Sequence, residues 1–241
     1  MKKIAFCFFG QVKNYQLLHE NYKNNLIDII ESTYSVDYYL HTNRLKNYYN
    51  PSINNNENHS IDYTSILPFY TFKDISYKLD YTLIKKIVEE YVSRFGVYWT
   101  KELTYTHGAL TTEYAVRQLY GLNEIFQMVK NSGVTYDKYI LTRPDLFFYD
   151  KITPKYLEYK EDISIPNFSH WYGYNDRFAI TNLQGFITYT ERLNYLLETP
   201  QQITSEKLLK KIIKLKKNTL RFIPQNFIFD LCRANGVCMR N

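Results

Sequence analysis

Arg143 and Asp145 stand directly after a strand-like run, in the segment LTRPDLFFYD at residues 141–150. Residues 139–142 are of the β-branched, aromatic and apolar types that strands favour, and Pro144 has no N–H with which to continue a central ladder. Arginine binds phosphate through two parallel hydrogen bonds, and carboxylates bind divalent cations. Open α/β sheets bind ligands beyond the carboxyl ends of their strands. The pair is therefore either a surface ion pair or one edge of a ligand site.

A second charged pair, Asp176 and Arg177, precedes another short apolar run, and Trp171, Tyr172 and Asn175 come just before it. A carboxylate beside an arginine is either a structural ion pair or a general base with its positioning partner. Aromatic rings stack on the C–H faces of sugars, whose hydroxyls need polar partners. This segment is either a platform for a sugar acceptor or a set of core aromatic residues under a loop.

The turn after the first apolar run offers a third polar group, with Gln11 and Lys13 following Gly10. No G-x-G-x-x-G or Walker motif occurs, and the chain has only 8 glycines. Bound phosphate would therefore be held by side chains, a helix N-terminus or a metal rather than by a glycine-rich loop. The alternative is an ordinary turn between a strand and a helix.

Strand and helix patterns alternate along the chain and would position these residues. Apolar runs predict strands, and apolar residues at three- and four-residue spacing predict helices. The predicted strands are 3–9, 36–42, 138–142, 162–166 and 177–181, and the predicted helices are about 14–31, 80–96, 111–130 and 205–217. This order favours an α/β fold with a mostly parallel sheet. We expect one domain over residues 1–241, with a loop insertion at about 44–78, where Asn and Ser are frequent.

The formal net charge of +6 suits an anionic ligand such as a nucleotide, or peripheral contact with an acidic membrane surface. Nucleic acid is not expected, because the lysine run at residues 207–217 fits the solvated face of a helix. The 3 cysteines are an odd number without metal-type spacing, which argues against a disulfide framework and for a reducing compartment. The apolar stretch near residue 5 is too short for a membrane span. We expect a cytoplasmic protein without a transmembrane segment.

Four segments in order, KIAFCFFGQVKNY, YILTRPDLFF, NDRFAITN and SEKLL, resemble small glycosyltransferases of the GT-A fold, which occur in large DNA viruses and in bacterial surface-polysaccharide clusters. The resemblance covers most of the chain apart from the insertion. It implies a single Rossmann-like α/β domain with a central, mostly parallel mixed sheet flanked by helices. It also implies transfer of a sugar from a nucleoside-diphosphate sugar to a hydroxyl of a glycan or glycoconjugate acceptor.

The resemblance also implies roles for the donor side of the site. The turn after the first strand would contact the nucleotide, which here means Phe9, Gly10, Gln11 and Lys13. The acidic motif after the central strand usually binds a metal and the diphosphate, but this chain keeps one acid of the usual Asp-x-Asp. Either Asp145 coordinates Mn²⁺ or Mg²⁺, or Arg143 takes over part of the charge neutralisation and no metal is needed. We carry the metal forward as the expectation.

On the acceptor side, the resemblance makes Asp176 the base that deprotonates the acceptor hydroxyl in an inverting transfer, with Arg177 beside it. Trp171, Tyr172 and Asn175 would border the acceptor. Two other functions remain open: a different nucleotide-dependent enzyme, such as a nucleotidyltransferase, and a non-catalytic carbohydrate-binding module on the same scaffold.

Overall fold

A seven-stranded sheet forms the centre of the computed structural model, which describes all residues except 46, 49–58, 97–104, 199–203, 233–237 and 240–241. The strand order is β10-β8-β9-β6-β1-β2-β5, and every strand runs parallel to the rest except β9. The bounds are β1 Lys3–Phe9, β2 Ser35–His41, β5 Phe72–Ser76, β6 Lys138–Thr142, β8 Ile163–Pro166, β9 Phe178–Thr181 and β10 Leu220–Ile223. This confirms the expected α/β class, a Rossmann-like arrangement with a mostly parallel mixed sheet.

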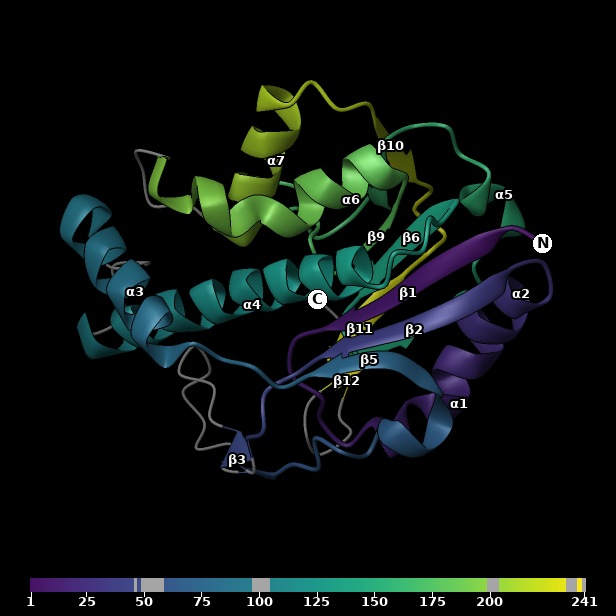
Figure 1. The fold of residues 1–241 in the computed structure, drawn as a ribbon, viewed down its shortest axis with the longest axis horizontal. Helices are drawn as coiled ribbons and strands as arrows, with labels where there is room; N and C mark the ends of the chain where they lie inside the picture. The colour runs from purple at the N-terminus through teal and green to yellow at the C-terminus, as the bar shows by residue number, and fades with distance from the viewer. Residues whose placement is uncertain (46, 49–58, 97–104, 199–203, 233–237, 240–241) are drawn as a thin grey trace.

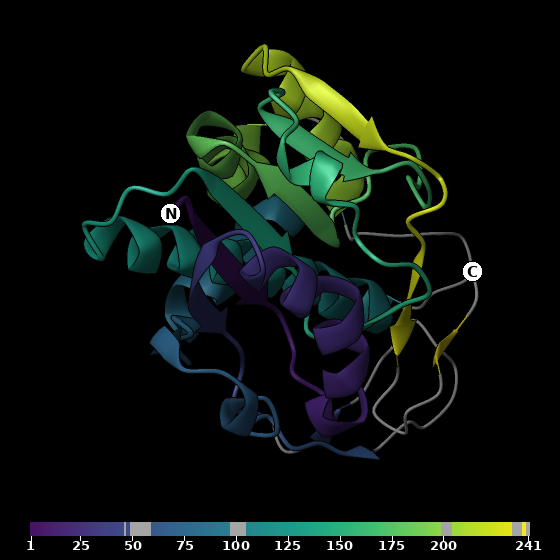
Figure 2. The ribbon, with the colours of Figure 1, turned by 90° about the vertical axis from the view of Figure 1, so that its right-hand side faces the viewer.

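Helical segments cover both faces of the sheet (Figure 1). One face carries α4 Tyr105–Asn131, α6 Leu183–Thr190 and α7 Ser205–Leu215, together with the 3₁₀ segment η4 Glu191–Glu198, while α3 Tyr81–Phe95 packs on α4 and η4. The other face carries η1 Tyr15–Leu17, α1 His19–Tyr22, η2 Lys23–Ile27 and α2 Asp28–Glu31, which lie in front of the strands in Figure 2. Two short helical segments are η3 Leu67–Phe69 and α5 Pro154–Leu157.

Two smaller sheets accompany the central one. The first has the order β12-β11-β7 and is antiparallel, with β7 Leu146–Phe148, β11 Phe229–Cys232 and β12 Cys238–Met239. The second pairs β3 Asn47–Tyr48 with β4 His59–Ser60. The loop expected at about 44–78 therefore includes η3 and ends in β5, the edge strand of the central sheet. Half-buried residues make up most of β5, so its sequence lacks the alternation by which a strand is recognised.

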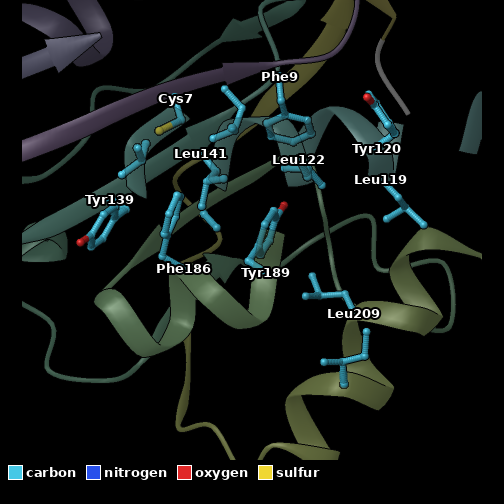
Figure 3. Packing of buried hydrophobic residues seen from close by; sticks show 14 of the residues in the cluster. Cys7, Phe9, Leu119, Tyr120, Leu122, Tyr139, Leu141, Phe186, Tyr189 and Leu209 are labelled. Carbon is cyan, nitrogen blue, oxygen red and sulfur yellow. The ribbon is translucent and has the colours of Figure 1, made fainter. Parts of the chain in front are cut away.

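Strand β1 is buried on both faces, as its continuous apolar sequence predicts. Its alternate side chains enter two separate core layers, Ala5, Cys7 and Phe9 on one face and Ile4, Phe6 and Phe8 on the other. Figure 3 shows the first layer, where side chains from β1 and β6 meet those of α4, α6 and α7. Burial of each of these Phe side chains stabilises the folded state by on the order of 2 kcal/mol, which favours the central position of β1 in the sheet.

Local signals at the ends of α3 are confirmed, and two other helices differ from their expected form or extent. Asp80 caps α3 by accepting a hydrogen bond from the N–H of Leu83 at 2.9 Å, and Gly96 follows the helix with φ of 77°. The helix expected at about 14–31 is instead divided into η1, α1, the π-helical η2 and α2. The helix expected at about 111–130 begins earlier, at Tyr105.

Cys232 is disulfide-bonded, whereas Cys7 is free and buried in the core. The sequence prediction had argued against disulfides, because three cysteines without regular spacing suggest a reduced protein. The expectation of a reducing compartment rested partly on that argument and loses this support. Within the described residues, no helix is both long enough and apolar enough to cross a membrane.

Candidate functional site

The carboxyl ends of three neighbouring parallel strands meet around a cavity of about 140 Å³. In the register of the sheet, Phe9 at the end of β1 lies opposite His41 at the end of β2, and Phe8 lies opposite Thr142 at the end of β6. In the strand order, β2 lies on one side of β1 and β6 lies on the other, and ligands of open α/β sheets bind beyond the strand ends at such a point.

Residues after these strands line the cavity. Gly10 and Gln11 come from the turn after β1, Asn43 follows β2, and Arg143 follows β6. Gly10 has φ of +96°, a conformation that residues with a Cβ rarely adopt, so glycine is required to turn the chain here. The Nε2 of Gln11 donates to the carbonyl oxygens of Val12 at 3.0 Å and Asn43 at 3.4 Å, while its Oε1 is buried without a partner among the described residues.

Helix α4 supplies the remaining wall through Tyr114, Arg117 and Gln118. The Arg117 guanidinium is ion-paired with Glu113 one turn earlier and lies over the rings of Tyr81 and Tyr114, at 5.4 and 5.9 Å from their centroids. Its Nε is buried and finds no acceptor within the described part of the chain. The cavity is therefore lined by two guanidinium groups, those of Arg117 and Arg143.

His41 also lines the cavity and is packed tightly against α4. A Cβ added at Gly121 would lie 2.6 Å from His41 Nδ1, so glycine at this helix position lets the imidazole approach the backbone. Burial lowers the pKa of His41, and the ring is bonded through Nε2 to the carbonyl oxygen of Lys78 at 2.9 Å. A neutral ring with Nε2–H as donor leaves Nδ1 as an acceptor.

Asp145 is fully buried and is bound by two cations. Arg143 donates from Nε to Oδ1 and from Nη2 to Oδ2, both at 2.8 Å, and Lys13 Nζ donates to Oδ2 at 2.8 Å. Burial would raise the pKa of the carboxyl, but Arg143 and Lys13 hold it well below its usual range. The turn itself is anchored because the Arg143 N–H donates to the Arg177 carbonyl oxygen at 3.1 Å.

The expected metal does not fit Asp145 in this arrangement. Both carboxylate oxygens already accept charge-assisted hydrogen bonds, and a divalent cation at either oxygen would lie next to Lys13 or Arg143. Across the described residues, no three His, Cys, Asp or Glu side chains are grouped closely enough to hold a metal ion. Side chains, rather than a metal, supply the positive charge at this position.

Asp176 is almost fully buried and lies at the centre of a polar network. Its Oδ2 accepts hydrogen bonds from Gln118 Nε2 at 2.9 Å and from the Ser205 hydroxyl, and Arg192 Nη1 lies 3.5 Å away. Arg192 has no exposed surface and is itself held by the Tyr189 carbonyl oxygen, which accepts from Nε at 2.9 Å. These donors orient the Asp176 carboxylate and keep its charge balanced.

Gln118 connects this network to the cavity. It lines the cavity wall and donates its side-chain N–H to Asp176. The strand-end cavity and the buried carboxylate therefore belong to one continuous site, although their residues come from separate parts of the sequence.

Glu206, in the first turn of α7, adds a second carboxyl group beside Asp176. Burial raises the pKa of Glu206 to about 7, the negative charge of Asp176 contributes to the rise, and Arg177 opposes it. A carboxyl group that titrates near neutral pH can accept and release a proton, as a general acid or base must.

The loop before β9 carries the exposed aromatic residues. Trp171 and Tyr172 are 53% and 88% exposed, and both have positive φ values of 44° and 64°, a conformation that is costly for residues other than glycine. The loop rests on the start of α7, where the N–H of Tyr174 donates to the carbonyl oxygen of Glu206 at 3.0 Å. The aromatic pair therefore borders the Asp176 and Glu206 region but does not line the cavity.

Several residues predicted from the sequence lie in this region, but not all can contact a ligand. Gly10, Gln11 and Arg143 line the cavity, and Asp176 and Arg177 lie next to it. Other predicted contacts are buried and occupied by the protein itself. Phe9 packs in the core, Lys13 is paired with Asp145, and Asn175 holds the loop through its bonds to Phe168 and Arg177.

Sequence reasoning missed Arg117, Gln118 and His41, and it treated Glu206 only as a charge favourable to the start of a helix. Arg117 and Gln118 fall outside the apolar stripe of α4, where helical spacing cannot distinguish a solvated side chain from one that faces a cavity. Two larger hollows, of about 400 and 450 Å³, lie beside α1 and at the amino ends of β1 and β6. Neither is at the strand ends where ligands of open sheets bind.

Comparisons with known proteins give distant structural likeness and no match in sequence. No protein-family model matches the chain, and no curated protein matches it. Among solved structures, the chain is similar to the apo form of mouse xyloside xylosyltransferase 1, with a TM-score of 0.45 and 10% sequence identity. The similarity covers 92% of this chain and 85% of that one. A likeness at this score does not show an activity.

Proposed function

We propose that the chain is a glycosyltransferase, which transfers a sugar from a nucleoside-diphosphate sugar to a hydroxyl group of a glycan or glycoconjugate. The observation that carries the proposal is the Gln118 bridge between the strand-end cavity and Asp176. A sugar transferase needs an anion site for the leaving group next to a carboxylate for the acceptor hydroxyl. This site offers both groups in contact with one side chain.

The donor would occupy the cavity. Arg143 and Arg117 offer N–H groups suited to phosphate oxygens, and the Gln11 Oε1 offers an acceptor for a nucleotide hydroxyl or amino group. The cavity volume of about 140 Å³ is below the range of about 300–1,000 Å³ that encloses a whole small ligand. We therefore infer that the cavity takes the diphosphate portion of the donor, while the rest extends along the surface.

The acceptor would approach from the side of Trp171 and Tyr172, whose exposed rings suit the C–H faces of a sugar. In an inverting transfer, Asp176 takes the proton of the acceptor hydroxyl as its oxygen bonds to the anomeric carbon of the donor. The bond from that carbon to the diphosphate breaks, and the nucleoside diphosphate leaves with the electron pair. Glu206 is the neighbouring carboxyl group able to exchange this proton near neutral pH.

The first test is a thermal-shift panel of nucleoside diphosphates and nucleotide sugars, with EDTA and with added Mn²⁺. We expect at least one compound to raise the melting temperature, because a ligand that binds only the folded state stabilises it. A nucleotide sugar that stabilises the protein should also be hydrolysed slowly without an acceptor. If no compound stabilises the protein in either buffer, the proposal is wrong.

Asp176→Asn distinguishes the enzyme from a carbohydrate-binding module. We expect turnover to fall by roughly 100-fold or more while donor binding is retained, since a general base contributes about this much. Asp162→Asn is the matched control, because Asp162 is also bonded by several donors but lies at the amino end of β8. No turnover by the unmodified protein, with unchanged carbohydrate affinity in Asp176→Asn, would favour a binding module. Release of pyrophosphate from a triphosphate would favour a nucleotidyltransferase.

A further inference from the structure

The buried ion cluster of Lys13, Arg143 and Asp145 has a positive net charge. Two cations surround a single carboxylate, and each of the three side chains is 21% exposed or less. Three hydrogen bonds of 2.8 Å to the Asp145 carboxylate hold the cluster together. A divalent cation at Asp145 would be repelled by both Lys13 and Arg143, whereas an anion beside Arg143 would be attracted.

The described residues that line the cavity also favour an anion over a divalent cation. It includes Arg117 and Arg143 but no aspartate or glutamate. Its histidine, His41, packs against α4 and donates from Nε2 to the Lys78 carbonyl oxygen. Hard divalent cations prefer carboxylate and carbonyl oxygens, so this wall suits phosphate oxygens better than it suits Mg²⁺ or Mn²⁺.

Arg117 is held in place before any ligand arrives. The ion pair to Glu113 and the rings of Tyr81 and Tyr114 fix its guanidinium, which is 16% exposed. The buried Nε donor has no acceptor among the described residues, and an unmade hydrogen bond of this kind is costly in the absence of a ligand. Gln11, which also lines the cavity, has a buried Oε1 that finds no donor among the described residues.

We propose that Arg117 and Arg143 bind the diphosphate of the donor and neutralise it as the leaving group, without a divalent cation. This inference rests on the proposed glycosyltransferase function. In the transfer, the electron pair of the broken bond passes to the diphosphate oxygen, and the two guanidinium groups stabilise that charge through hydrogen bonds. Arg117 acts as a donor through its guanidinium group, and Arg143 extends the positive ion cluster to the ligand.

The inference is tested by binding of nucleoside diphosphates, with ADP, GDP, UDP, CDP and dTDP as probes, measured by calorimetry in EDTA and then with Mn²⁺ or Mg²⁺. We expect the best probe to bind in EDTA, with an affinity that changes by less than about threefold when a cation is added. Arg117→Gln should weaken binding by about 10- to 100-fold, the range for hydrogen bonds to charged groups. Arg117→Lys, which keeps the charge but not the planar fork, should recover only part of this loss.

Arg221→Gln is the matched control. Arg221 lies on the edge strand β10, away from the cavity, and is paired with Glu161. It should bind the probe like the unmodified protein. Binding that requires Mn²⁺ or Mg²⁺ would overturn this inference and leave the glycosyltransferase proposal standing. Unchanged binding by Arg117→Gln would overturn it as well. Failure of every diphosphate and nucleotide sugar in both buffers would overturn both proposals together.

Discussion

Asp145 is the residue whose role differs most between sequence and structure. After an apolar strand, Arg-x-Asp suggests a metal ligand, but the folded chain makes the acid the anion of a buried ion cluster. Burying a carboxylate is costly unless it is paired and hydrogen-bonded, and Lys13 and Arg143 meet both conditions. The acid therefore positions Arg143 at the cavity and keeps Lys13 in the interior.

Asp145→Asn should be strongly destabilising because Lys13, only 7% exposed, would lose its carboxylate partner. We expect a loss of about 3–5 kcal/mol in the free energy of unfolding, measured by urea denaturation. Asp74→Asn on the exposed side of β5 is the control and should change stability by less than about 0.5 kcal/mol. A loss below about 1 kcal/mol for Asp145→Asn would contradict the buried ion cluster.

Residues could be predicted from the sequence where a strand end determines their position. Gly10, Gln11 and Arg143 follow apolar strands and do line the cavity. Arg192 could not be predicted, because a fully buried arginine is rare and depends on partners that the fold brings from elsewhere. Arg117 could not be predicted either, because the sequence pattern does not distinguish it from the other polar residues on the solvated side of a helix.

At the scale of elements, the loop before β9 and the first turn of α7 form one unit. Gly173 lies so close to the Glu206 backbone that an added Cβ would overlap its carbonyl group. This contact fixes where Trp171 and Tyr172 are presented. It also fixes the start of α7, where Thr204 caps the helix by accepting from the Lys207 N–H at 3.1 Å.

Gly173→Ala should displace the loop from α7 and misplace the acceptor side of the site. We expect kcat/KM for the acceptor to fall by roughly 10- to 100-fold with donor binding unchanged, as misplacement by about 1 Å can have this effect. Gly185→Ala is the control, because its Cβ would overlap the Asp162 backbone in a similar way but at α6 and away from the cavity. The control should lower the melting temperature without changing the activity of the folded protein. Equal acceptor kinetics in both variants would exclude this role for the loop.

Elements could be predicted where the signal is local. The capped helix α3 and the buried strand β1 follow from the residues within them. The edge strand β5 could not be predicted, because its strand character comes from pairing with β2, where the register shifts between Tyr38 and Tyr39. The division of residues 15–31 into 3₁₀, α and π segments likewise depends on packing against the sheet.

At the scale of the whole molecule, the site is assembled from distant parts of the chain. The alternation of strands and helices predicts a mostly parallel sheet, but it does not place β9 antiparallel between β6 and β8. That reversal puts Arg177 beside Arg143 and carries Asp176 to the cavity side of the sheet. The Gln118 bridge depends on α4 crossing the same edge. These long-range placements could not be predicted from a single sequence.

The stability of the whole protein should therefore depend on pH through Glu206. Burial and the nearby charge of Asp176 raise the pKa of Glu206 to about 7 in the folded state, above its ordinary value of 4.5 in the unfolded chain. Between these two values the folded state holds more protons, so the free energy of unfolding falls as pH rises from about 4.5 to 7 and then levels off. Glu206→Gln removes this titration and should be more stable than the unmodified protein above pH 7, by about 1–3 kcal/mol. Urea denaturation across this pH range measures the difference.

Glu158→Gln, at an exposed position, is the control and should keep the pH dependence of the unmodified protein. The same slope in Glu206→Gln would show that this carboxyl group is ionised at neutral pH and would remove it as the proton-exchanging neighbour of Asp176.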